Sequence, residues 1–169
     1  MVKENLERPG VHLKEDDFEQ RKVLSEIYHP KARYAWVTGL AVGRFLSELK
    51  QGKIIGIKCE HCRRVVVPPR VFCEWCFRRT TSWVYLPDTG TVNTFSVSHI
   101  AANTTRLKTP IIPAVIEIDE SSNAGFLHLI GDTSPEDVRI GLRVKAVWRP
   151  SSERTGSITD IKYFRLVGP

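Results

Sequence analysis

Four cysteines in the pattern C-x2-C-x10-C-x2-C are the feature that most constrains this chain. They are its only cysteines, and they are Cys59, Cys62, Cys73 and Cys76. Two residues between paired thiols let a tight turn direct both sulfurs at one ion, and two such turns supply a tetrahedral set. The pattern predicts one structural metal site. Zinc is favoured, and iron is the competing ion because a rubredoxin-type centre uses the same four thiolates.

Other uses of four clustered thiols fit the sequence less well. The charged N-terminus and the lack of an apolar run of about 18 residues predict a cytoplasmic protein. Disulfides rarely persist in that reducing compartment. A thioredoxin-like redox pair needs only one C-x2-C motif, so the second pair would be unexplained. Arg63 and Phe77 follow the second thiol of each pair where many ribbon knuckles place glycine, so turns of slightly unusual geometry are expected.

The metal pattern has a consequence for catalysis. If all four thiols bind the metal, the ion has no open position for water, and no cysteine is left as a nucleophile. The sequence also contains no G-x-S-x-G, Walker or H-E-x-x-H motif. We therefore expect no catalytic residues in this chain.

The positive charge is concentrated around the cysteines. The formal net charge is +6, and residues 50–80 carry eight basic and two acidic side chains, whereas residues 81–169 carry nine of each. Such a patch attracts a phosphorylated ligand, a nucleic acid or an acidic protein surface, or it forms a solvated face. Apart from Lys50, which belongs to the predicted helix, these basic residues form the candidate patch: Lys53, Lys58, Arg63, Arg64, Arg70, Arg78 and Arg79.

A helix is predicted from about residue 34 to Lys50. Its apolar residues recur at i, i+3, i+4 and i+7, and Gly52 follows as a stop signal. Trp36 and Leu40 extend this apolar surface by one turn. The face docks either on the chain's own core or on another protein, and the candidate docking residues are Trp36, Leu40 and Phe45.

The C-terminal half predicts five short strands, separated by Pro, Gly, Asn, Asp and Ser. Between the third and fourth strands, Ser134 and Pro135 predict a single helical turn. This element order is that of an OB-fold barrel, against the alternative of a generic small β-barrel or sandwich. The strands are predicted at residues 90–100, 112–118, 125–131, 142–149 and 157–166.

The fold class expected is mainly β, with an N-terminal helix, a rubredoxin-like zinc ribbon and a C-terminal five-stranded OB-fold barrel. The predicted divisions are an N-terminal extension (1–33), a docking helix (34–52), the zinc ribbon (53–80) and the barrel (81–169).

The order of these parts resembles a known family. The tryptophan-led helix and G-K-I are followed by two C-x-x-C pairs that flank V-P-P-R, then by a G-T-V strand start and S-P-E-D-V-x-I-G-L-x-V. Together they resemble the archaeal and bacterial zinc-ribbon/OB-fold family first catalogued as a domain of unknown function. The resemblance covers about residues 34–167.

The resemblance implies a non-catalytic subunit that associates with acyl-CoA and with thiolase-superfamily enzymes. It implies a partner that supplies the nucleophilic cysteine, in a hetero-oligomer of α2β2 type or larger. Arg63, Arg64 and Arg70 are the candidate contacts to the CoA phosphates.

The competing hypothesis is a nucleic-acid-binding module, because zinc ribbons and OB-folds both do that work. A barrel that binds single strands is expected to carry basic and exposed aromatic residues on its second and third strands. Here IPAVIEID and GFLHLIG contain no Lys or Arg. The sequence therefore favours the accessory-subunit reading.

Overall fold

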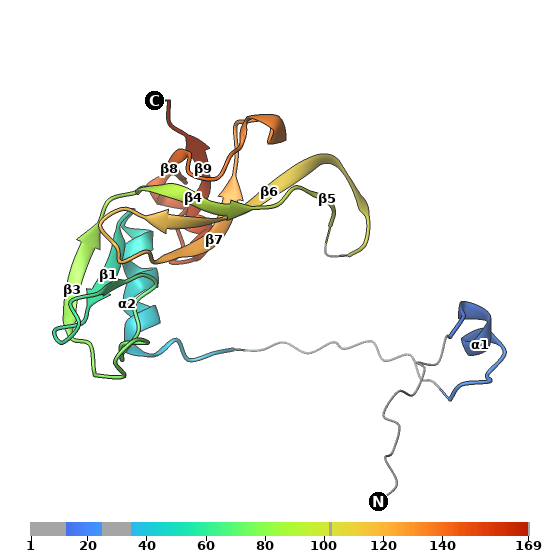
Figure 1. Cartoon of the computed structure of the whole chain (residues 1–169), viewed down its shortest axis with the longest axis horizontal. Coiled ribbons are helices and arrows are strands. Elements are labelled where there is room, and N and C mark those ends of the chain that lie inside the picture. The colour runs from blue at the N-terminus through green and yellow to red at the C-terminus, as the bar shows by residue number, and fades with distance from the viewer. Residues whose placement is uncertain (1–12, 25–34, 102, 169) are drawn as a thin grey trace, which may run out of the picture. The chain divides into compact units, whose positions relative to one another are not determined.

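The computed structural model of the chain describes residues 13–24, 35–101 and 103–168 (Figure 1). The chain divides into two units, Met1–Trp36 and Val37–Pro169, and each is considered separately. In the first unit, residues 13–24 and 35–36 are described, and they include a five-residue helix, α1 (Glu15–Glu19), that buries none of its residues. The rest of the predicted N-terminal extension lies largely outside the described residues. No helix in the described ranges combines the length and the apolar character needed to cross a bilayer.

The predicted helix of the second unit is α2 (Gly39–Lys50). It begins later than predicted, because residues 35–38 are not helical. It ends as predicted: Gly52 has a φ of 75°, and its N–H donates to the carbonyl of Leu49 at 2.8 Å. Such a left-handed residue after a helix satisfies one of the last free carbonyls.

The zinc ribbon is a small antiparallel sheet. Its strands pair in the order β2-β1-β3. Cys59 and Cys62 lie in the turn between β1 and β2, and Cys73 and Cys76 lie in the segment between β2 and β3. Along β1 all residues from Ile54 to Ile57 are buried, and the neighbours Ile54 and Ile55, which point to opposite faces of the strand, both belong to the hydrophobic core. The ribbon strands are β1 (Ile54–Lys58), β2 (Val65–Val66) and β3 (Ser82–Leu86).

The C-terminal half is a closed five-stranded barrel, which confirms the OB-fold prediction. Strand β4 pairs with both β6 and β8, β8 pairs with β9, β6 pairs with β7, and a parallel β7–β9 pairing closes the ring. The predicted helical turn is the 3-10 turn η1 (Pro135–Asp137) between β7 and β8. The strands are β4 (Thr89–Phe95), β6 (Arg106–Ile118), β7 (Gly125–Ile130), β8 (Arg143–Trp148) and β9 (Ile161–Leu166).

Three strands differ from the sequence prediction. The strand predicted at residues 90–100 ends at Phe95, and Ser98–Ile100 form a separate short strand, β5. Strand β6 begins at Arg106 instead of residue 112, and its first half pairs with β5. Strand β9 begins at Ile161, because the residues before it form a 3-10 turn, η3 (Ile158–Asp160).

One hydrophobic core joins the helix, the ribbon and the barrel. Buried residues of all three parts belong to a single cluster. Examples are Phe45 and Leu49 of α2, Ile54, Ile55 and Leu86 of the ribbon, and Val92, Ile116, Phe126, Val144 and Phe164 of the barrel. Since the three parts share their buried apolar surface, we expect residues 37–168 to unfold in one transition.

A buried carboxylate holds the loop between β8 and β9. Asp160 is 1% exposed, and its two oxygens accept hydrogen bonds from the backbone N–H groups of Thr155, Gly156 and Ser157 at 2.8–3.1 Å. Burial alone would raise the pKa of Asp160. The three N–H groups and the charge of Arg154 outweigh burial and hold that pKa below its ordinary value of 3.8.

The Asp160→Asn variant is expected to be less stable than the wild type by about 2 kcal/mol at pH 7, because an amide nitrogen cannot accept from these N–H groups. A group with a lowered folded-state pKa stabilises above its unfolded-state pKa, and this contribution is lost as pH falls through the folded-state value. The difference between the two proteins should therefore be full at pH 7 and shrink below about pH 4. Urea unfolding at several pH values measures it. The exposed Asp137→Asn is the control, and equal losses in both variants would contradict the prediction.

Candidate functional site

The two cysteine pairs lie in turns with the same backbone hydrogen bonds. In the first, the N–H of Arg63 donates to the carbonyl of Cys59 at 2.8 Å; in the second, the N–H of Phe77 donates to the carbonyl of Cys73 at 2.9 Å. Arg63 and Phe77 have φ values of 64° and 56°, in the left-handed region that favours glycine. Both turns therefore have a left-handed residue after the second thiol, as they would with glycine. Arg63 and Phe77 adopt this conformation although it is unfavourable for a residue with a side chain.

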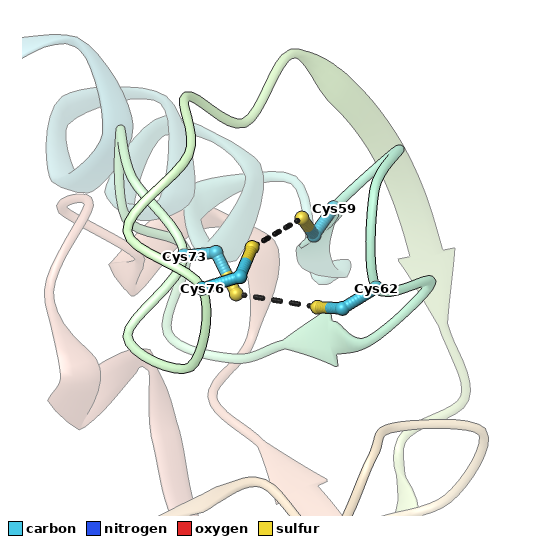
Figure 2. A group of neighbouring side chains, drawn as sticks. All are labelled: Cys59, Cys62, Cys73 and Cys76. Atoms are coloured by element: carbon cyan, nitrogen blue, oxygen red, sulfur yellow. Dashed lines mark hydrogen bonds between the residues drawn. The ribbon is translucent and has the colours of Figure 1, made fainter.

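The four sulfurs converge on one point. Figure 2 shows the side chains of Cys59, Cys62, Cys73 and Cys76 pointing toward one another, two from each turn. The Sγ atoms of Cys59 and Cys76 are 3.5 Å apart, those of Cys62 and Cys73 are 3.4 Å apart, and all four lie within 4.8 Å of one another. Four thiolates at about 2.3 Å from a central ion form a tetrahedron with edges of about 3.8 Å. The cluster therefore fits one tetrahedral metal ion.

The backbone prepares one thiol of each turn to lose its proton. The N–H of Cys62, with that of His61, hydrogen-bonds to Cys59 and lowers the pKa of that thiol to about 7. The N–H of Cys76 likewise lowers the pKa of Cys73. Across the site, the sulfur of Cys59 faces that of Cys76, and the sulfur of Cys73 faces that of Cys62. The pKa values of these two facing thiols are raised instead of lowered.

The two partner thiols hold their protons more tightly. The N–H of Arg64 favours the thiolate of Cys62, but burial and the hydrogen bond to Cys73 outweigh it and raise the pKa of Cys62 to about 11. The N–H of Arg78 favours the thiolate of Cys76, but burial and the hydrogen bond to Cys59 raise the pKa of Cys76. A metal ion that binds all four thiolates must displace these protons, so metal affinity rises with pH.

The three candidate arginines have different surroundings. Arg63 and Arg70 are exposed, and each lies near a carboxylate of its own turn, Glu60 at 3.8 Å and Glu74 at 3.3 Å. Such exposed pairs are weak and can exchange for a phosphate. Arg64 is half-buried instead: its Nη2 donates to the carbonyl of Ser122 in the barrel at 2.9 Å. Its position indicates a structural role in addition to any ligand contact.

The three candidate docking residues also differ in their exposure to solvent. Phe45 is 3% exposed and packs edge-on against Phe126 of the barrel, so its ring belongs to the core and is not available to a partner. Leu40, at the start of α2, is 79% exposed, and Trp36 is 83% exposed. The helical periodicity identified an apolar face, but most of that face is covered by the chain itself.

Sequence reasoning missed a polar cavity of about 390 Å³ where the ribbon meets the barrel. It brings Arg70 of the ribbon close to barrel residues that are distant in the sequence. Its polar lining residues are Arg70, Glu74, Asn93, Glu117 and Asn123. Only the V-P-P-R motif signalled this place, because the other side chains meet there through tertiary packing.

A second cavity, of about 370 Å³, lies on the barrel. Its lining is largely apolar and includes Leu127, Leu129 and Ile158, together with the basic side chains of Arg149 and Lys162. The alternation of β7 could have signalled it, since Leu127 and Leu129 are exposed whereas Phe126 and Ile130, on the other face of the strand, are buried.

Two family models match adjoining parts of the chain. Residues 46–82 match the ChsH2 rubredoxin-like zinc ribbon domain, and residues 83–149 match the ChsH2 C-terminal OB-fold domain. These matches agree with the ribbon and the barrel described above.

Two relatives are described as DUF35 domain-containing scaffold proteins. The one from Methanocaldococcus jannaschii is 38% identical over 101 residues, which cover 59% of this chain and 70% of the relative. The one from Methanothermobacter thermautotrophicus is 27% identical over 101 residues, which cover 59% of this chain and 74% of the relative.

Solved structures have the same fold. A DUF35-family protein of unknown function from Sulfolobus solfataricus superposes with a TM-score of 0.58 and 25% identity, over 76% of this chain and 84% of that one. A chain of the Ltp2-ChsH2(DUF35) aldolase superposes with a TM-score of 0.54 and 19% identity, over 82% of this chain and 98% of that one.

Proposed function

Because this chain belongs to the DUF35 family, in which a zinc ribbon is joined to an OB-fold domain, we propose that it is a non-catalytic subunit of a thiolase-type acyltransferase complex. In this role it scaffolds the partner enzyme and helps to bind CoA or an acyl-CoA. The description of its relatives as scaffold proteins supports the first part. The Ltp2-ChsH2(DUF35) aldolase, whose name joins a DUF35 protein to an enzyme, supports an enzyme as the partner.

One observation carries the proposal: all four cysteines of the chain converge on a single site. A thiolase-type reaction needs a cysteine nucleophile, and a thiolate bound to a closed tetrahedral metal site is not available for attack. The nucleophile must then come from the partner. The ion, which we infer to be zinc, would be held by Cys59, Cys62, Cys73 and Cys76, and its chemistry would be structural.

The CoA assignment rests on charge and position. Arg63 and Arg70 are exposed on the basic ribbon, and Arg70 also lines the polar cavity between ribbon and barrel. A planar guanidinium can bind a phosphate through two hydrogen bonds. We assign Arg63 and Arg70 to the phosphates of CoA, with Arg64 between them holding the ribbon to the barrel.

An affinity pull-down of the tagged chain from nuclease-treated native lysate tests the proposal. The expected result is the recovery of a thiolase-superfamily enzyme in a complex that contains at least two copies of each subunit, identified by mass spectrometry and sized by light scattering. The purified complex is then expected to bind CoA. Recovery of ribosomal or polymerase components, or binding to single-stranded nucleic acid that weakens steeply with salt, would instead support the nucleic-acid hypothesis.

A further inference from the structure

The second cysteine turn presents an unusual amount of apolar surface to solvent. We define the second-knuckle patch as Val71, Phe72, Trp75 and Phe77. The first two are 48% exposed, Trp75 is 71% exposed and Phe77 is 79% exposed. Single exposed hydrophobic residues are common on protein surfaces, but four within seven residues concentrate exposed apolar surface in one turn, as interaction sites do.

The backbone of Phe77 gives an independent indication. Its φ of 56° is a conformation that is sterically unfavourable for a residue with a Cβ and that glycine adopts without a steric penalty. Because the ring is mostly exposed, its packing within the chain offsets little of the free energy that this conformation costs. A large aromatic residue at a position suited to glycine therefore suggests that the ring is used in an interaction with another molecule.

Arg64 fixes the other large ring of the patch. Its guanidinium lies 5.1 Å from the centre of the Trp75 ring, and the same side chain is bonded to Ser122 of the barrel. Trp75 is thus both exposed and held in place, which lowers the entropy that it would lose on binding. Rigid aromatic residues with nearby arginines are typical of the centres of protein interfaces.

The charge around the patch indicates which surface it fits. Residues 58–79 carry six basic and two acidic side chains, and Arg78 and Arg79 at the edge of the patch are both exposed. An acidic surface with an apolar hollow is complementary to this arrangement. A nucleic acid fits less well, because the carboxylates of Glu60 and Glu74 lie among the arginines and Val71 offers no ring for base stacking.

We propose that the second-knuckle patch is the surface by which the ribbon docks on its partner, with Phe77 as the anchor in an apolar hollow that has an acidic rim. This inference rests on the proposed function, since the partner is the thiolase-type enzyme of that proposal. It names the contact residues and the chemistry of the partner's surface.

The test compares the wild type with Phe77→Gly in the full-length, metal-loaded chain. The probe is the purified thiolase-type enzyme recovered with the wild type, and the measurements are Kd by calorimetry, metal content and thermal midpoint. Phe77→Gly is expected to weaken binding about thirtyfold or more, as the loss of an interface anchor does. Its metal content should be unchanged and its thermal midpoint no lower, because glycine suits the backbone of this position.

Ile140→Ser is the matched control. Ile140 is a large apolar residue, 67% exposed, on the barrel and outside the patch, and its substitution should change Kd by less than about twofold. The double variant Arg78→Glu and Arg79→Glu tests the charge assignment: it should slow association and reduce the dependence of binding on salt.

The outcomes separate this inference from the proposed function. If Phe77→Gly binds the enzyme as well as the wild type, or if it loses affinity only together with its metal, the patch is not the docking surface and the proposed function stands. If the arginine variant keeps its association rate, the partner surface is not acidic. If the wild type captures no thiolase-type enzyme, the proposed function fails and the docking assignment fails with it.

Discussion

The Cys73→Ser variant is expected to lose its metal ion and to unfold roughly 10 °C or more below the wild type. Cys73 is completely buried, and its sulfur lies 3.4 Å from that of Cys62 across the site. A serine hydroxyl is a poor ligand beside three thiolates, and without a metal it becomes a buried polar group. The ribbon should then lose the link between its two turns.

The effect should reach the barrel, because ribbon and barrel share one core. The far-UV circular dichroism and the tryptophan fluorescence of Cys73→Ser are expected to change in one coincident transition at the lower temperature. Elemental analysis measures the metal, and it also decides between zinc and iron in the wild type. His61→Ala is the control, since His61 is an exposed residue of the first turn and is not among the four converging ligands. Two separate transitions in Cys73→Ser would show that the barrel folds independently.

The Gly125→Ala variant is expected to lower the free energy of unfolding by about 3 kcal/mol. Gly125 begins β7 opposite Glu117 of β6, and an added Cβ would lie 1.8 Å from the carbonyl oxygen of Ile116. The end of a flexible side chain could move away, but this neighbour is the backbone of a strand that is paired on both sides, with β4 and with β7. The two strands would have to separate at the turn that joins them.

Urea unfolding measures this loss, and Gly168→Ala is the matched control. Gly168 lies near the C-terminus, and an added Cβ there would meet no atom within 4 Å. The control should keep the stability of the wild type. If Gly125→Ala were equally stable, the β6–β7 pairing at this end of the barrel would be looser than the structure shows.

The regular parts of this fold could be predicted from the sequence. The spacing of the cysteines identified the ribbon, and the alternation in 142–149 identified a strand whose Val144 and Ala146 are buried while Arg143 and Lys145 are exposed. The order of strands and the single turn at Pro135 identified the OB-fold barrel. Each of these signals is local, so a short window of sequence contains it.

The predictions were wrong where tertiary contacts determine the bounds of a strand or the burial of a side chain. The first half of β6 contains Pro110, and proline is among the residues that separate the predicted strands. That half pairs with β5 on one side only, and a proline is tolerated where one edge of a strand is unpaired. The face of α2 was identified correctly, but periodicity alone could not show that Phe45 lies against Phe126 of this chain instead of against a partner.

The role of Arg64 could not be predicted from the sequence for the same reason. Its partner Ser122 is 58 positions away in the sequence, and the ring of Trp75 lies in the other cysteine turn. The cavity that Arg70 lines is likewise formed by three separate segments of the chain. Composition predicted a basic ribbon, but not which arginines hold the fold and which face solvent.

The joint between ribbon and barrel limits how the two domains can be recombined. Besides the bond from Arg64, Val65 and Ser122 are connected by two hydrogen bonds of 2.9 Å, one from the N–H of Val65 to the Ser122 hydroxyl and one from the N–H of Ser122 to the Val65 carbonyl. A ribbon grafted onto the barrel of a relative would therefore need a β6–β7 turn of matching length and with a serine at this place. The family models meet between residues 82 and 83, but an engineered chimera that exchanges the domains there must carry this distant turn along with the ribbon.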